Sequence, residues 1–242
     1  MSTLFIPRIV VAKCLLVTAT MLPIALITTP PASAQGIAKI SNLDAATGLK
    51  DALAQGAAKA VSSLGQQNGF LGNNNVKIPL PAGLQRVEGL MRGIGMGSYA
   101  DQLVNTMNQA AESAVVEARP LLADAIKRMT VQDAKGILSG PQDSATQYFQ
   151  RTTSAALTQR FMPIVKQATA KVQLADTYNN FAGKAATFGL LKADDANLDA
   201  YVTQKALDGL FFMIAQEEKA IRDNPLAAAT SIAKTVFGAL GR

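Results

Sequence analysis

Four charged residues close a long apolar run in the stretch LDGLFFMIAQEEKAIRDNP, residues 207–225, and they are the first place to look for chemistry. With residues 100° apart on a helix, Glu217 falls in the sector of the apolar residues one turn before and one turn after it. Glu218 falls on a flank, where Arg222 is within reach at i+4. A carboxylate among apolar neighbours must pair with a cation or take up a proton. Glu217 is therefore the candidate site residue, and we expect Glu218, Lys219 and Arg222 to form a solvated helix end.

Two interpretations of Glu217 are open. In the first, Glu217 forms a structural ion pair with Arg151, Arg160 or Lys205 and holds two helices in register. In the second, Glu217 lines a cavity, either as a general acid or as the anchor for a cationic ligand. The helix that faces Glu217 decides between them.

The rest of the composition removes whole classes of chemistry. The chain has 242 residues with one Cys, which is Cys14, and it has no His and no Trp. After Cys14, the chain therefore has no residues for a Ser-His-Asp or Cys-His nucleophile. It also has no residues for a zinc site with nitrogen or sulfur ligands. Carboxylate chemistry, a Ser-Lys pair and oxygen-ligated metals remain, and we assign no catalytic residue, no metal ligand and no cofactor.

Two short motifs are weak on inspection. Asp195, Asn197 and Asp199 match positions 1, 3 and 5 of a calcium loop, but position 6 is Ala200 and position 12 is Ala206 instead of the required Gly and Glu. Polar side chains that cap a helix N-terminus explain this segment better.

Glu112-Ser113 on a helical chain is similar to the acid motif of lytic transglycosylases. The Gly-rich segment that should follow is absent, and no Trp is available to stack on a sugar. Glu112 also lies with Asn108 on the expected polar face of its helix, whereas a general acid needs a cleft and a raised pKa.

The first 34 residues are typical of a cleaved export signal. Arg8 and Lys13 supply a positive flank, an apolar core follows, and an A-x-A signal ends at Ala34. We expect cleavage after Ala34 and a periplasmic chain of residues 35–242 with no membrane span. That chain has 21 Lys and Arg against 17 Asp and Glu, a charge of +4, which is too mild and too evenly spread for a nucleic-acid partner.

Apolar spacing of i, i+3 and i+4 predicts helices over most of residues 35–242. The predicted helices cover residues 43–65, about 81–94, 98–118, 130–138, 143 to about 188 with a break or kink at Pro163, 197–223 and 225–240. Thr130 and Asp133 predict a capping box, and Asp143 or Ser144 is expected to cap the following helix. The fold class is therefore an all-α, single-domain helical bundle over residues 35–242.

One segment differs from this pattern. We name residues 65–83, GQQNGFLGNNNVKIPLPAG, the strap, because they predict one long extended connection. Phe70 and Leu71 are large apolar residues that would not stay exposed without cause. In one interpretation Phe70, Ile78 and Leu80 pin the strap across the helices, and in the other the strap is a lid or a partner-docking edge.

The stretches GLKDALAQGAAKAVSSLG, GFLGNNNVKIPLP, YFQRTTSAALTQRFMPIVKQATAKV and NLDAYVTQKALDGLFFMIAQEEKAIRDNP resemble the domain of unknown function 4197 family. The resemblance runs from about residue 43 to residue 237. It implies an exported, α-helical protein of the Gram-negative cell envelope, and it supplies no activity, cofactor or catalytic residue.

The function that these observations favour is a non-enzymatic envelope protein that binds or scaffolds a partner or an apolar ligand. The candidate ligand- or partner-facing residues are Glu217, Arg151, Phe70, Leu71 and Ile78. One alternative is a hydrolase that acts on an envelope component through carboxylates, with Glu217 as its acid. The other is a membrane-surface protein attached through the amphipathic segment 225–240.

Overall fold

Most of the residues that the structure describes form helices, as the apolar spacing predicts. The computed structural model describes residues 42–82, 85, 92–93, 95, 97–171 and 197–224. Its helices are α2 (Asn42–Leu64), α4 (Gly97–Val115), α5 (Ala118–Arg128), α6 (Val131–Ser139), α7 (Ser144–Thr169) and α9 (Leu198–Asp223). The all-α prediction is confirmed. The predicted leader, most of the helix expected over about 81–94, the part beyond residue 171 of the helix expected to reach residue 188, and the segment 225–240 lie outside the described residues.

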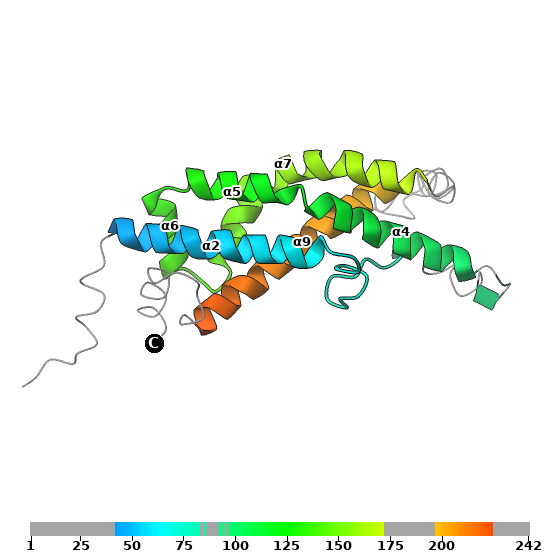
Figure 1. Cartoon of the computed structure of the whole chain (residues 1–242), viewed down its shortest axis with the longest axis horizontal. Helices are drawn as coiled ribbons and strands as arrows, with labels where there is room; N and C mark the ends of the chain where they lie inside the picture. Colours follow the sequence, from blue (N-terminus) through cyan, green and yellow to red (C-terminus); the bar gives the residue numbers. More distant parts are fainter. Residues whose placement is uncertain are drawn as a thin grey trace, which may run out of the picture.

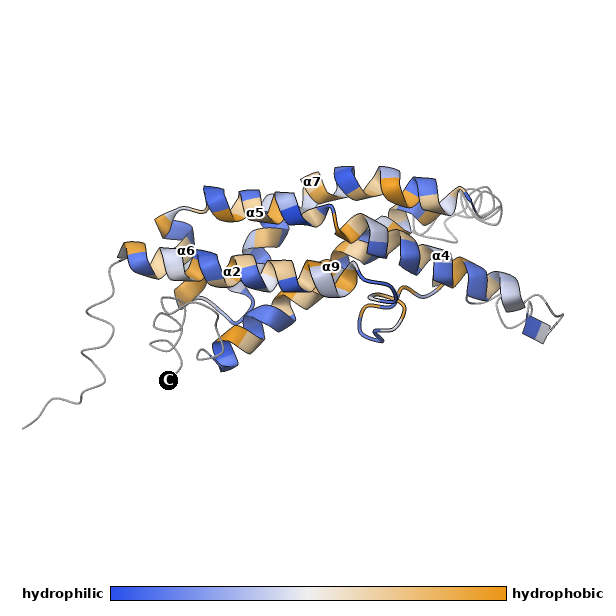
Figure 2. Ribbon diagram, in the orientation of Figure 1, coloured by the Kyte–Doolittle hydropathy of each residue, from blue (hydrophilic) through white to orange (hydrophobic). Residues whose placement is uncertain are grey.

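The helices form an elongated bundle with α9 at its centre. Figure 1 shows α2, α4, α5 and α7 running along the length of the bundle, while α9 crosses obliquely behind α2. Helix α9 packs against α7, α2 and α4, so it buries apolar residues on more than one side. In Figure 2 hydrophobic and hydrophilic positions alternate along these helices. Burying each large side chain there contributes about 1.5–3 kcal/mol.

The core draws on every described helix. Its largest fully buried side chains are Phe70, Phe149, Phe161, Leu49, Leu64, Ile78, Leu103, Met107, Leu122, Leu157, Leu198 and Leu210. Two of these, Phe70 and Ile78, come from the strap and not from a helix. The strap is therefore part of the core.

Several helix ends follow from local sequence. Thr130 and Asp133 form the predicted capping box, in which each side chain binds the backbone N–H of the other residue. The hydrogen bonds from Thr130 lower the pKa of the Asp133 carboxyl. Asn197 caps α9 by accepting from the N–H groups of Asp199 and Ala200, as expected for an amide at a helix start.

Pro120 and Pro163 both lie within helices. The helix predicted over residues 98–118 ends at Val115, and Pro120 lies in the first turn of α5, where its missing N–H costs nothing. Pro163 lies inside α7, which continues to Thr169. A break at Pro163 is therefore wrong.

The strap crosses the bundle without regular secondary structure. Val76, Ile78 and Leu80 are buried, and Lys77 and Pro79 between them are exposed, so the side chains of residues 76–80 alternate between core and surface. The Phe70 ring lies against α9 at Gly209, where an added Cβ would be 2.6 Å from Cε1 of Phe70. A larger residue at position 209 would therefore force the Phe70 ring to shift.

Candidate functional site

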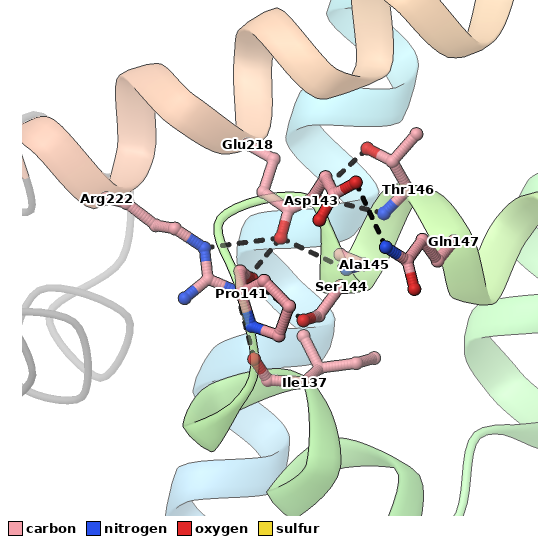
Figure 3. Close-up of polar contacts among 9 residues, drawn as sticks. All are labelled: Ile137, Pro141, Asp143, Ser144, Ala145, Thr146, Gln147, Glu218 and Arg222. Carbon is pink, nitrogen blue, oxygen red and sulfur yellow. Dashed lines mark hydrogen bonds and ion pairs between the residues drawn. The ribbon is translucent and has the colours of Figure 1, made fainter.

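The end of α9 carries a buried carboxylate that completes the start of α7. Glu218 is only 4 % exposed. Its Oε1 accepts a hydrogen bond from the backbone N–H of Ala145 at 3.0 Å, and its Oε2 accepts from the N–H of Thr146 at 2.9 Å (Figure 3). The Thr146 hydroxyl also donates to Oε2. Because the first N–H groups of a helix have no partner within that helix, Glu218 acts as their cap from a residue 73 positions away.

Arg222 balances this carboxylate. Its Nη2 lies 2.9 Å from Oε1 of Glu218, and the same nitrogen donates to the Ile137 carbonyl at 2.9 Å. Figure 3 shows the guanidinium between the carboxylate and that carbonyl at the end of α6. The Arg222 side chain is only 14 % exposed. The pair therefore joins α9, α7 and α6 at one point.

These contacts correct the expectation of a solvated helix end. Glu218 and Arg222 are not a solvated helix end, although Lys219 is exposed as predicted. The cause is tertiary, because the N-terminus of α7 meets α9 at Glu218.

The cap predicted for α7 is also wrong. Asp143 holds the N-cap position but makes no capping hydrogen bond. Its carboxylate accepts from the side chain of Gln147 instead, and the Ser144 hydroxyl donates to the Pro141 carbonyl (Figure 3). The acid from α9 takes the place that a local side chain usually fills.

Glu217 faces α2. Its carboxylate lies 2.8 Å from Nζ of Lys59, and the side chains of the two residues are 14 % and 67 % exposed. The three cations expected as partners lie elsewhere: Arg160 and Lys205 pair with other acids, and Arg151 lies over a tyrosine ring. Glu217 is therefore an ion-pair residue between α9 and α2, with a partner that sequence spacing did not identify.

Two polar residues of α4 hold the strap from inside. Asn108 is fully buried; its Oδ1 accepts from the backbone N–H of Ile78 at 2.9 Å and its Nδ2 donates to the Ile78 carbonyl at 2.9 Å. One turn later, the Glu112 carboxylate accepts from the N–H groups of Phe70 at 3.2 Å and Leu71 at 3.4 Å. Asn108 thus supplies to Ile78 the hydrogen bonds that a neighbouring strand would supply to an extended segment, and Glu112 supplies an acceptor to the turn at Phe70 and Leu71.

Asn108 and Glu112 correct the expected polar face of α4. Both were placed opposite the apolar stripe, and both are buried because the strap covers that face. The sequence does contain a signal for this arrangement. Two hydrogen-bonding side chains at i and i+4 lie close in sequence to a proline-containing extended segment whose own backbone groups need partners.

An open groove lies outside the strap, where it meets α4. It has a volume of about 690 Å³ and a mixed polar and apolar lining. The residues lining it come from the strap, the chain after the strap and α4: Leu71, Lys77, Pro79, Leu80, Gln85, Arg92, Asp101, Val104 and Asn105. Arg92 and Asp101 form an ion pair across it at 2.6 Å.

The candidate residues of the strap divide between core and groove. Phe70 and Ile78 are fully buried and belong to the core, so they are anchors. Leu71 is half-buried and lines the groove. Arg151 and Glu217 do not line the groove. Sequence reasoning missed Lys77, which lies on the exposed side of the strap beside Pro79.

Groups that could hold a metal are lacking among the residues described between 42 and 224: no three His, Cys, Asp or Glu side chains converge there. Within the same residues, no helix combines the length and the apolar character that a membrane span requires.

The comparisons with known proteins give one result. No curated protein and no solved structure matches the chain. The model of a protein family described as "Protein of unknown function (DUF4197)" matches residues 39–238, which confirms the resemblance carried by the four stretches quoted above. The chain therefore belongs to this family of proteins of unknown function.

Proposed function

We propose that the protein is an exported, non-enzymatic binding domain whose groove between the strap and α4 takes an extended polypeptide segment of a partner protein. One observation carries the proposal: the groove is open, its volume is about 690 Å³, and its wall is fixed before any partner arrives. The wall is fixed because Asn108 and Glu112 bind the strap backbone at Ile78, Phe70 and Leu71. A surface that is already ordered loses little conformational entropy on binding.

The character of the lining favours a polypeptide over a small apolar ligand. Small-molecule sites are enclosed and mostly apolar, whereas protein interfaces mix an apolar centre with a polar rim. Here Leu71, Leu80 and Val104 supply apolar surface, and Lys77 and Asn105 lie beside them.

The carboxylates give less support to a hydrolase. Glu112 and Glu218 bind backbone N–H groups, and Glu217 binds Lys59. Each of these acids thus has a structural partner, which accounts for its position without a reaction.

Export is part of the proposal and rests on the leader sequence. The positive flank, the apolar core and the A-x-A signal ending at Ala34 predict a mature protein that begins at Gln35. N-terminal sequencing of the protein from the native envelope tests this. A chain that still begins at Met1 would refute export with cleavage.

The binding proposal is tested by blocking the groove. Asn105 is exposed on α4 and lines the groove, so Asn105→Trp fills the groove without disturbing the core. Ser113→Trp places the same side chain on the exposed side of α4, about 12 Å further along the helix at 1.5 Å per residue. Far-UV circular dichroism checks that both variants fold.

The probe is a phage-displayed library of linear random peptides, selected on protein purified from cells that express the full chain. We expect enriched peptides that bind the parent and Ser113→Trp equally and that bind Asn105→Trp at least about tenfold more weakly. Enriched peptides that bind all three proteins alike would refute the groove as the site. If no peptide is enriched while a fluorescent fatty-acid anion binds and Asn105→Trp blocks it, the polypeptide class is refuted in favour of an apolar ligand.

A further inference from the structure

The charged residues that line the groove do not balance, and the excess charge indicates which kind of partner it would bind. Among the residues that the structure describes, three charged side chains line it: Lys77, Arg92 and Asp101. Arg92 Nη2 lies 2.6 Å from Oδ1 of Asp101 and donates a hydrogen bond to it, so these two charges largely cancel. That hydrogen bond, together with the charges of Arg92 and Lys77, holds the pKa of the Asp101 carboxyl below its usual value. Asp101 is thus ionised at neutral pH, so the two cations and one anion among the described lining residues leave a net charge of +1, and Lys77 is the cation of the two that lies outside the ion pair with Asp101.

Lys77 is held in place by its backbone. Its N–H donates to the Asn73 carbonyl at 2.8 Å, and the next residue, Ile78, is bound on both its N–H and its carbonyl by Asn108. Val76 and Ile78 on either side of it are buried, so the alternation of the strap directs the Lys77 side chain outward. Among the residues that the structure describes, no carboxylate forms an ion pair with the Lys77 ammonium.

The simplest alternative is that Lys77 is an ordinary solvated surface lysine. The surroundings of Lys77 favour a binding role. Lys77 lies in a groove beside Leu71 and Pro79, so a bound segment would exclude water from around the ammonium. A charge that loses water on binding must gain a partner, and a carboxylate is the partner that makes up the loss.

We propose that the groove selects acidic segments: the partner presents an Asp or Glu to Lys77, next to apolar side chains that contact Leu71, Pro79 and Val104. This inference rests on the proposed function, since it names the class of polypeptide that the same groove takes. Basic segments are disfavoured because they would bring a second cation to an uncompensated one.

Charge reversal at Lys77 tests the selection. Lys77→Glu changes an exposed side chain and leaves the backbone contacts of the strap intact. Lys135→Glu on α6 makes the same charge change at an exposed lysine that does not line the groove, and α6 lies at the opposite end of the bundle from the strap in Figure 1. The peptide selection is run on the parent and on both variants.

We expect peptides enriched on the parent to contain an Asp or Glu beside apolar residues and to bind Lys77→Glu about tenfold more weakly. Their affinity for the parent should fall as salt is raised, since the contact is partly exposed. Selection on Lys77→Glu should enrich Lys or Arg at the corresponding position, and selection on Lys135→Glu should give the parental pattern.

The outcomes separate this inference from the proposed function. Peptides that Asn105→Trp blocks but that show no acidic preference, or that bind Lys77→Glu as well as they bind the parent, overturn the acidic class and leave the groove as a binding site. Peptides that Asn105→Trp does not block overturn both proposals.

Discussion

Replacing Glu218 by Gln should destabilise the protein far more than the same change at its neighbour Glu217. Gln keeps one oxygen, but its NH₂ group then faces either a backbone N–H of α7 or the guanidinium of Arg222, and neither accepts a hydrogen bond. Losing a partner from a buried ion pair costs about 3–5 kcal/mol, and hydrogen bonds to charged groups contribute about 1.5–3 kcal/mol each. Because Arg222 keeps its bond to the Ile137 carbonyl, we expect the lower end, about 3 kcal/mol.

The assay is urea unfolding followed by far-UV circular dichroism, with thermal unfolding as a second measurement. For a chain of this size, about 3 kcal/mol corresponds to a fall in Tm of about 6–12 °C. Glu217→Gln is the matched control, since Lys59 is 67 % exposed and exposed ion pairs contribute only about 0–1 kcal/mol. Native-state hydrogen exchange adds a local measurement, because the amides of Ala145 and Thr146 should lose protection in Glu218→Gln alone.

Two results would refute this reasoning. One is a loss of stability for Glu217→Gln as large as that for Glu218→Gln. The other is rapid exchange of the Ala145 and Thr146 amides in the parent protein, which would mean that Glu218 does not cap α7 in solution.

Three further outcomes are expected. Ile78→Ala should lower the free energy of unfolding by about 2–5 kcal/mol in urea unfolding, because Ile78 is a fully buried aliphatic; a change within about 0.5 kcal/mol would show that it is exposed. Gly209→Ala should lower the free energy of unfolding by about 1–3 kcal/mol, because the added methyl group overpacks against Phe70. Adding Phe70→Leu should recover part of that loss in the double variant, and no recovery would contradict the contact. The pKa of the Asp133 carboxyl is lowered on folding, so the stability that its ionised form contributes is present above about pH 4 and is lost as the pH falls through the folded pKa. Thr130→Val should reduce this acid dependence of Tm, and only modestly, because the site is near the surface. An unchanged dependence of Tm on pH would contradict the capping box.

Local rules predicted the parts of the fold whose causes are local. The capping box of Thr130 and Asp133 depends on residues three apart, and both of its hydrogen bonds are present. In residues 76–80 of the strap, apolar side chains recur at every second position, so the burial of Ile78 and Leu80 could be predicted from this alternation alone. In these cases, the residues that determine the structure are neighbours in sequence.

The sides of α9 that are buried could not be predicted in the same way. A helical wheel assigns one apolar side, but α9 packs against α2, α4 and α7, so more than one side is covered. Whether Glu217 or Glu218 is the more buried then depends on where α7 begins relative to α9. The groove was missed for a similar reason, since it forms where the strap meets α4 and neither segment shows it alone.

The way in which the strap is held has a consequence for how binding specificity could change in evolution. Stability depends on atoms facing inward: the backbone of Ile78 on Asn108, and the buried side chains of the alternating positions. The groove depends on atoms facing outward, above all the side chains of Leu71 and Lys77. Substituting an outward side chain therefore alters what the groove accepts while the inward contacts persist, and new specificity can arise without the loss of stability that often accompanies it.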